Sequence, residues 1–180
     1  MSDYIIKTSR LGLRNWIESD IEPANIMNAN SKVREFFPNT LSKEETIRFI
    51  RQMQAHFDKY GFCYFAVDRL DTKEFIGFIG LMNQTYQTSF TPFVDIGWRL
   101  LQNAWRNGFA TEGAKACLDY AFAELKLTKV YAIAPELNKK SQHIMQKLGM
   151  EIYTHFEYPK LDKNSPLRKC VAYRIKSKNY

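Results

Sequence analysis

The segment from Phe93 to Ala134 constrains the fold most, because it has the pattern of a strand, a helix and a second strand in succession. Phe93 to Leu101 alternates between apolar and polar positions, as a strand does. Arg106 to Leu125 carries an apolar stripe at helical spacing, and Val130 to Ala134 is a short apolar run. Such a unit is expected to pack its helix against a sheet. The pattern therefore predicts an α/β or α+β domain in three layers.

The rest of the chain adds strands and helices to this unit. Strands are expected over Thr8 to Trp16 (half-buried), Phe62 to Val67, Phe75 to Met82, Met150 to Tyr158 and Arg168 to Ile175. Helices are expected over Ser19 to Phe36, from a capping box at Ser42 to a stop at Gly61, and from an N-cap at Asn138 to Gly149. The length of 180 residues suits one domain, which we expect to cover residues 1–180.

Several classes of protein are disfavoured by composition. The start, Met1 to Tyr4, has no basic region followed by an apolar one, and the longest apolar stretch is too short to cross a bilayer. We therefore expect a cytoplasmic protein with no membrane partner. Three widely spaced cysteines indicate buried free thiols (Cys63, Cys117 and Cys170), and the histidines show no ligand spacing, so no metal site is predicted (His56, His143 and His155).

The positive charge is concentrated in the last third of the chain. Residues 126–180 hold 12 Lys or Arg against 4 Asp or Glu, whereas residues 1–125 hold 14 against 15. This excess is compatible with attraction of a phosphate-rich cofactor or of an acidic or RNA-bound partner. Because the lysines are scattered over several elements, it is equally compatible with an ordinary solvated surface.

The segment after Leu101 has features of a phosphate-binding helix start. The first amides of a helix lack internal partners and lie at the positive end of its dipole, so they stabilise an anion. Gly108 and Ala110 would leave this surface open, and Arg106 would add a charge-assisted contact. By itself, one glycine at this position is better explained by a tight turn.

An ordered series of motifs resembles the GNAT superfamily of N-acetyltransferases. Arg106 to Ala110 fits its phosphate-loop pattern, with Trp105 where Gln or Arg is usual. That Trp, followed by Thr111-Glu112, is similar to the ribosomal-protein N-terminal acetyltransferase branch (the RimJ/RimL type). Three further segments resemble the opening strand, the central strand and the last helix of that branch: Arg10 to Arg14, Phe75 to Leu81, and Asn138 to Met150.

The resemblance implies a GNAT-type fold and acetyl-CoA (CoA) as the cofactor. The expected sheet is mixed, mostly antiparallel, six- to seven-stranded, splayed in the middle and flanked by about four helices. The implied cofactor-binding residues are Trp98, Leu100, Leu101, Arg106, Asn107, Gly108, Phe109, Ala110, Thr111, Asn138 and Ser141. Trp98 to Leu101 would pair with the pantetheine arm, although a continuous strand also explains this segment. Asn138 is equally an ordinary N-cap.

The resemblance also implies direct attack of an amine on the thioester carbonyl, with a backbone N–H near Leu100 as the oxyanion donor. Asp95 is the candidate catalytic base, a role that requires burial or a water relay because the usual pKa of aspartate is about 3.9. A structural role in hydrogen bonding is the alternative for Asp95. Ser141 is the candidate donor of the proton to the CoA thiolate, with solvent as the alternative.

The sequence says less about the site of the acceptor amine than about the cofactor site. We expect the strand that carries Tyr153 and His155 to flank the acceptor cleft, and Tyr158 and Cys170 to lie in its far wall. A single histidine on a strand is more often an ordinary hydrogen-bonded polar residue than a functional one. The expected acceptor is a protein N-terminus, with a ribosomal protein as the family-level candidate, or a small amine. The enzyme would act as a monomer or a homodimer.

Two other functions compete with catalysis at the level of sequence. A non-catalytic CoA-binding or scaffold domain would keep the phosphate loop and lack turnover. A nucleic-acid-binding domain is suggested only by the basic last third, and the chain shows no recognition-helix motif or aromatic platform. We therefore expect no specific nucleic-acid partner.

Overall fold

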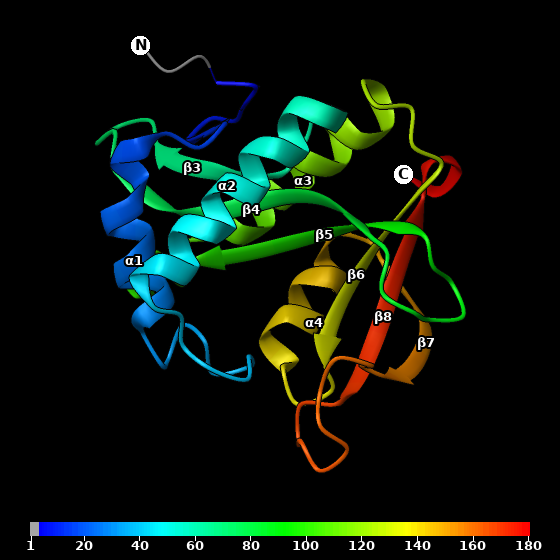
Figure 1. The fold of residues 1–180 in the computed structure, drawn as a ribbon. Coiled ribbons are helices and arrows are strands. Elements are labelled where there is room, and N and C mark those ends of the chain that lie inside the picture. Colours follow the sequence, from blue (N-terminus) through cyan, green and yellow to red (C-terminus); the bar gives the residue numbers. More distant parts are fainter. Residues whose placement is uncertain (1–3) are drawn as a thin grey trace.

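A computed structural model describes residues 4–180, so Met1, Ser2 and Asp3 of the start discussed above lie outside the described residues. One mixed eight-stranded sheet runs through the molecule, in the order β1-β2-β3-β4-β5-β6-β8-β7 (Figure 1). The strands are β1 (Ile6–Lys7), β2 (Leu11–Arg14), β3 (Tyr64–Arg69), β4 (Phe75–Gln84), β5 (Phe93–Leu100), β6 (Lys129–Pro135), β7 (Glu151–Glu157) and β8 (Lys169–Lys176). The α-helices are α1 (Ile21–Ala29), α2 (Lys43–Tyr60), α3 (Phe109–Ala123) and α4 (Lys139–Lys147).

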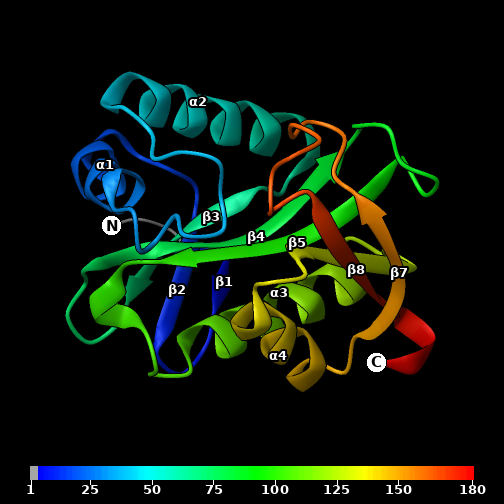
Figure 2. The same ribbon diagram turned by 90° about the horizontal axis from the view of Figure 1, so that it is seen from below.

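The helices cover both faces of the sheet, which gives the expected three layers. Helices α1 and α2 lie over one face, and α3 and α4 lie over the other (Figure 2). On the second face α3 packs so closely that a Cβ on Gly113 would lie 2.4 Å from Cδ1 of Ile79 on β4. The core between the layers includes fully buried side chains from both sides of the sheet, among them Leu11, Leu13, Met27, Met53, Phe65, Ile79, Leu81 and Leu118.

The second helix follows its sequence signals. The Ser42 hydroxyl accepts a hydrogen bond from the N–H of Glu45, and the Glu45 carboxylate accepts one from the N–H of Ser42, which is the predicted capping box. The helix ends where Gly61 adopts a left-handed φ of 77°. Both predicted ends of α2 are confirmed.

The first helix is shorter than predicted. It ends at Ala29, and the expectation of a helix to Phe36 is wrong. The reason lies in Asn30, whose side-chain oxygen accepts hydrogen bonds from the backbone N–H groups of Lys32 and Val33. These local bonds replace the helical pattern with turns, as asparagine side chains commonly do. The turns carry Phe36 and Phe37 back toward the sheet, beside β5.

Two further elements differ from their predicted bounds. The third helix begins at Phe109, not Arg106, because Arg106 and Gly108 adopt positive φ values of 64° and 79°. The first long strand is four residues and is buried on both faces, so the prediction of a half-buried strand is wrong. The Tyr4 ring covers Gly12, and an internal ion-pair network encloses Arg14. The additional strand β1 brings the sheet to eight strands.

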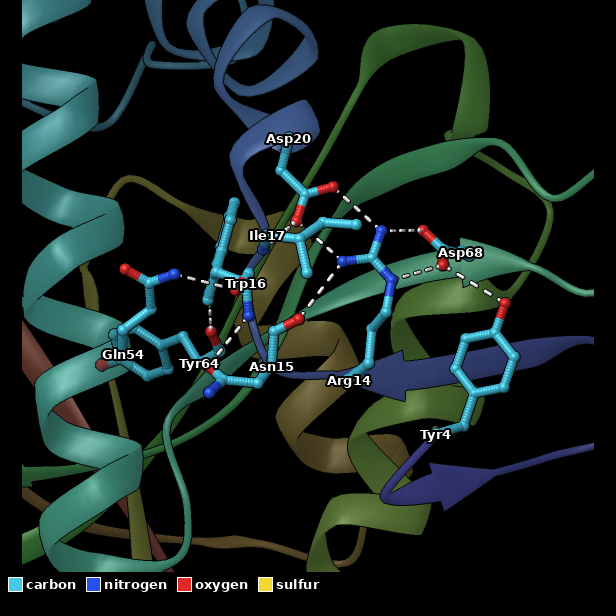
Figure 3. A network of polar contacts seen from close by, with 9 residues as sticks. All are labelled: Tyr4, Arg14, Asn15, Trp16, Ile17, Asp20, Gln54, Tyr64 and Asp68. Carbon is cyan, nitrogen blue, oxygen red and sulfur yellow. Dashed lines mark hydrogen bonds and ion pairs between the residues drawn. The ribbon is translucent and has the colours of Figure 1, made fainter. Parts of the chain in front are cut away.

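A buried network fixes β2 to β3 and to the start of α1 (Figure 3). The Arg14 guanidinium donates two hydrogen bonds to Asp68 on β3, at 2.7 and 2.8 Å, and two to Asp20, at 2.7 and 2.9 Å. All three side chains are almost fully buried. Burial alone would lower the pKa of Arg14, but the hydrogen bonds and charges of the two carboxylates outweigh it and raise the pKa. Arg14 therefore remains a cation.

The centre of the sheet opens between β5 and β6. These two parallel strands pair at one position, Asp95 with Tyr131, whereas on its other side β6 pairs with β8 along its whole length, from Lys129 to Pro135. The expected splay in the middle of the sheet is confirmed. Because the two strands diverge without a strand between them, the sheet offers a passage from its α1/α2 face to its α3/α4 face. None of the helices in the described part of the chain has the length and apolar character that a bilayer crossing requires.

Candidate active site

A cavity of about 420 Å³ occupies the divergence of β5 and β6. It reaches both faces of the sheet, because its walls include β5, the N-terminal part of α4 and the turns that follow α1. The residues that line it include Phe37, Tyr64, Phe78, Gln84, Tyr86, Asp95, Gly97, Trp98, Arg99, Asn138, Ser141, Met145, Tyr158, Lys160, Leu167 and Cys170. The cavity thus brings together four of the predicted catalytic and cofactor-binding residues, Asp95, Trp98, Asn138 and Ser141.

Asp95 lies in the cavity wall and is 9% exposed. The Tyr64 hydroxyl donates a hydrogen bond to its Oδ1 at 2.8 Å, and the Gln84 amide donates a second at 3.2 Å. Burial raises the pKa of Asp95 to about 6, although these two hydrogen bonds oppose the rise. The condition set by the sequence argument, that burial must make this aspartate a stronger base, is therefore met.

The Tyr64 side chain reaches Asp95 because Gly97 on β5 carries no side chain. A Cβ on Gly97 would stand 3.0 and 3.2 Å from two ring carbons of Tyr64 and 3.4 Å from its hydroxyl oxygen. The ring also stacks on Phe78, with centroids 5.3 Å apart and planes inclined by 21°. The backbone carbonyl of Tyr64 accepts a 2.6 Å hydrogen bond from the Trp16 indole, which fixes its strand against β2 (Figure 3).

The end of β5 presents free backbone groups to the passage. The N–H of Leu101 donates to Ile76 on β4 at 2.9 Å, so it is engaged within the sheet. Because hydrogen bonding alternates along an antiparallel strand, the backbone groups of Trp98 and Leu100 point away from β4, toward the splay. The Leu100 carbonyl accepts from the Trp105 indole at 2.9 Å. The Leu100 N–H and both backbone groups of Trp98 therefore face the passage.

Asn138 and Ser141 lie at the start of α4, on the other side of the passage. The Asn138 side chain accepts a hydrogen bond from the N–H of Ser141 at 3.1 Å, so the N-cap prediction is confirmed. Both residues also line the cavity. The two explanations offered by the sequence for Asn138 are compatible with this geometry.

The loop before α3 forms an open cradle of amides. The first intrahelical bond runs from the N–H of Glu112 to the carbonyl of Gly108, so the N–H groups of Phe109, Ala110 and Thr111 precede it. Apart from its chain neighbours, the one atom of residues 4–180 within 4 Å of a Cβ built on Gly108 is Nη2 of Arg10, at 3.5 Å. Bare amides, a helix N-terminus and a nearby guanidinium form a donor set that suits a pyrophosphate.

The side chains of this loop lie in different environments. Phe109 is buried, and its ring lies 4.7 Å from the Arg10 guanidinium, so it offers only its backbone to a ligand. Arg106 and Asn107 are exposed. Arg10 was considered only as part of a strand, yet it donates to the Asn107 carbonyl at 3.0 Å and pairs with Glu112 at 2.5 Å. No local sequence signal links residues so far apart.

The predicted flanking residues on β7 do not line the cavity. His155 is exposed and its Nδ1 lies 2.6 Å from the Glu136 carboxylate. Tyr153 packs on Tyr131 and on the Arg174 guanidinium. Neither residue lines this cavity, because β7 is the outer strand of the sheet and β8 and β6 lie between it and the opening.

The far wall and several polar residues complete the cavity. Tyr158 and Cys170 line it as expected. Other polar residues in the wall, among them Tyr64, Gln84 and Arg99, were not predicted from sequence. Tyr64 and Gln84 come from β3 and β4, and only the antiparallel register of β3, β4 and β5 brings them to Asp95.

Comparison with known proteins identifies the class. The family model described as "Acetyltransferase (GNAT) domain" matches residues 10–151. The chain belongs to this family, and it is an acetyl-CoA-dependent N-acetyltransferase. The open cradle before α3 and the passage between β5 and β6 fit a ligand with a pyrophosphate and a long arm, as the cofactor acetyl-CoA has.

Individual relatives agree with this assignment. A curated relative, the uncharacterized N-acetyltransferase YoaA of Bacillus subtilis, is 29% identical over 151 residues, which cover 82% of each chain. A GNAT-family acetyltransferase from Bacillus anthracis matches with a TM-score of 0.79 at 24% identity, over 96% of this chain and 98% of the other.

Two solved structures that share the fold contain CoA. Spermidine N-acetyltransferase from Vibrio cholerae, in complex with CoA and spermine, matches with a TM-score of 0.76 at 21% identity, over 96% and 99% of the two chains. RimL, a ribosomal L7/L12 α-N-protein acetyltransferase in complex with CoA, matches with a TM-score of 0.77 at 13% identity, over 97% and 98%. The two enzymes differ in acceptor, so the fold alone does not select one.

Proposed function

We propose that the enzyme acetylates a primary amine by direct attack within a ternary complex, and that the acceptor is a protein N-terminal α-amino group of the ribosomal-protein type or a small amine. One observation carries the mechanism: a buried carboxylate, Asp95, lies in a cavity that passes between β5 and β6 to the start of α4. The proposal includes a single acetyltransferase domain over residues 1–180, of the RimJ/RimL-like branch, acting in the cytoplasm.

The proposed cofactor site uses the loop and the passage. The amides of Gly108 to Thr111, with Arg106 and Asn107 at the rim, would hold the pyrophosphate. The free backbone groups of Trp98 and Leu100 would pair with the pantetheine arm, and Asn138 and Ser141 would contact it from α4. When bound, the cofactor supplies an acetyl thioester. In this proposal Phe109 and Leu101 support the loop and the strand rather than contact the arm through their side chains.

The proposed catalytic roles follow from the geometry around Asp95. Its carboxylate receives the proton of the attacking amine, and a pKa of about 6 leaves it ionised at neutral pH. The N–H of Leu100 donates to the carbonyl oxygen as that oxygen gains negative charge. As the acetyl group passes from sulfur to the amine nitrogen, Ser141 would give a proton to the leaving thiolate and regain one from solvent.

The test is thiol release from acetyl-CoA with a panel of acceptors. The panel contains peptides with free N-terminal Ala, Ser or Met, free amino acids, polyamines and aminoglycosides. Turnover with one class names the acceptor, and Asp95→Asn is expected to lower kcat by about 10² to 10⁴. Turnover by Asp95→Asn equal to that of the native enzyme would remove the proposed base. Failure of every amine to accelerate thiol release would refute the proposed acceptor class.

A further inference from the structure

Arg99 is a charged residue of the cavity wall to which the proposed chemistry gives no role. It lies on β5, four residues after Asp95 and on the same face of the strand. Its guanidinium is held between two aromatic rings, with Cζ 4.1 Å from the centroid of Phe37 and 5.0 Å from that of Phe78. The rings fix its position beside the cavity without neutralising its charge.

The donors of this guanidinium are mostly unsatisfied. Its one hydrogen bond to a residue in the range 4–180 runs from Nη1 to Oδ1 of Asn28, at 3.0 Å. Nε is buried without a partner. In the described part of the chain Arg99 forms no ion pair. An arginine that keeps several free donors beside a cavity matches the way that proteins recognise carboxylates and other planar anions.

The charges around Arg99 also favour an anionic ligand in the cavity. Burial, and then the like charge of Arg34, lower the pKa of Arg99 to about 9, so the side chain is still a cation at neutral pH. Among the residues that line the cavity, the charged ones are Asp95, Arg99 and Lys160. With Asp95 assigned to the reacting amine, the remaining charges in the wall are positive. A ligand with an anionic group is favoured there, and a second ammonium group is disfavoured.

The spacing limits the size of that ligand. Four residues along a strand separate the Cα atoms of Asp95 and Arg99 by about 13 Å. Allowing for the two side chains, the reacting amine and the anion lie farther apart than the two ends of one free α-amino acid. An extended peptide advances about 3.3 to 3.6 Å per residue, so about four residues match the full Cα separation. A hydrogen-bond contact of about 3 Å at each end leaves about 7 Å between the reacting amine and the anion, which two to three residues span.

We propose that Arg99 selects an acceptor that carries a carboxylate two to three peptide residues from the reacting amine. The carboxylate has two sources with the same chemistry: an acidic side chain near a protein N-terminus, or the C-terminus of a di- or tripeptide. The proposal rests on the proposed acetylation of amines and names the acceptor class within it. Polyamines are poor acceptors on this basis, because their second ammonium group meets Arg99.

The first experiment uses the native enzyme and matched acceptors. Ser-Ala-Glu-Ala amide is compared with Ser-Ala-Gln-Ala amide, and Ser-Ala-Ala free acid with its amide, by kcat/KM for thiol release. The acidic member of at least one pair is expected to be preferred by about tenfold or more, as one charge-assisted hydrogen bond permits. The first pair reports an acidic side chain, and the second reports a C-terminal carboxylate.

The second experiment assigns the preference to Arg99. Arg99→Met is expected to abolish the preference for the acidic peptide while leaving turnover of the neutral peptide and acetyl-CoA binding unchanged. Arg51→Met, which removes the same charge from the exposed face of α2, is the matched control and should keep the preference. Arg99→Lys keeps the charge without the planar fork and should retain part of the preference.

Different failures lead to different conclusions. Equal kcat/KM for acidic and neutral peptides in the native enzyme, or a preference that survives in Arg99→Met, overturns this inference and leaves the acetyltransferase proposal intact. Spermidine accepted better than every acidic peptide also overturns it. Absence of turnover with every amine, with acetyl-CoA still bound, refutes the proposed acceptor class itself.

Discussion

The hydroxyl of Tyr64 on β3 donates a 2.8 Å hydrogen bond to Oδ1 of Asp95 on β5, across the intervening strand β4. The tyrosine thereby stabilises the ionised form of a carboxylate that burial disfavours, and the pKa of Asp95 settles at about 6 as the net result. Burial raises the pKa of Asp95 and the hydrogen bond from Tyr64 lowers it. We therefore expect both the pH profile of activity and the free energy of unfolding to depend on this pair.

The pH dependence of activity should shift when the tyrosine hydroxyl is removed. In Tyr64→Phe the hydrogen bond that lowers the pKa of Asp95 is lost, so that pKa rises above about 6. The acidic limb of the kcat/KM profile is expected to move upward by about one pH unit, the equivalent of a hydrogen bond to a charged group. Tyr60→Phe, at an exposed tyrosine, is the matched control. An unshifted acidic limb in Tyr64→Phe would mean that this limb does not report Asp95.

The stability of the protein should depend on pH through the same carboxylate. The folded pKa of about 6 lies above the value of 3.8 for a free aspartate, so the folded state binds more protons between pH 4 and pH 6. The protonated carboxyl of Asp95 therefore makes its full contribution to the free energy of unfolding below pH 4, and this contribution is lost as pH rises through 6. Asparagine does not ionise, so Asp95→Asn avoids this loss. The free energy of unfolding of the variant at pH 8 should exceed that of the native protein by about 1–3 kcal/mol.

Denaturant unfolding at both pH values measures this difference. At pH 4 the native and Asp95→Asn proteins should unfold with similar free energies, because the native carboxyl is then protonated. A gain in the variant that is equally large at pH 4 and pH 8 would contradict an origin in ionisation of Asp95.

A side chain at Gly108 should weaken the binding of acetyl-CoA to the phosphate loop. Gly108→Glu places a side chain and a negative charge among the amides of the cradle, and acetyl-CoA affinity should fall about a hundredfold or more. Gly61→Glu is the matched control, because Gly61 has a similar φ of 77° and, its chain neighbours aside, no atom of the described residues lies within 4 Å of its Cβ position. It introduces the same backbone strain and charge at the end of α2. Calorimetric titration that shows equal losses in both variants would exclude a specific role of Gly108.

The buried Arg14 network should dominate the stability of the N-terminal half of the sheet. Arg14→Met leaves Asp20 and Asp68 buried without a cation, so the free energy of unfolding should fall by about 3–5 kcal/mol. Lys43→Met breaks the exposed pair with Glu22 and should cost about 1 kcal/mol or less. Adding Asp20→Asn and Asp68→Asn to Arg14→Met should recover part of the loss. Equal losses in Arg14→Met and Lys43→Met would contradict the network.

Local elements were predictable because their signals are local. The capping box at Ser42 and the stop at Gly61 determine α2, since a side chain three residues from a backbone amide closes the bond without tertiary help. The alternation of β5 placed Asp95, Gly97 and Arg99 on one face. The strand–helix–strand order and the motif series led to the family that the comparison confirms. The end of α1 was predicted wrongly, because the apolar pattern permits a helix beyond Ala29. The hydrogen bonds that the Asn30 side chain accepts from the backbone favour turns there instead.

The tertiary structure alone decided what surrounds the catalytic candidate. Tyr64 stands 31 positions before Asp95 and reaches it only because the register of β3, β4 and β5 aligns the two and Gly97 leaves room for the ring. Phe37 comes to Arg99 because α1 ends early and the chain turns back. Sequence thus determined the helices, the strand pattern and the family, whose signals act over a few residues. Strand order and turns determined the environment of Asp95 and Arg99, since burial and neighbouring charge depend on contacts between distant segments.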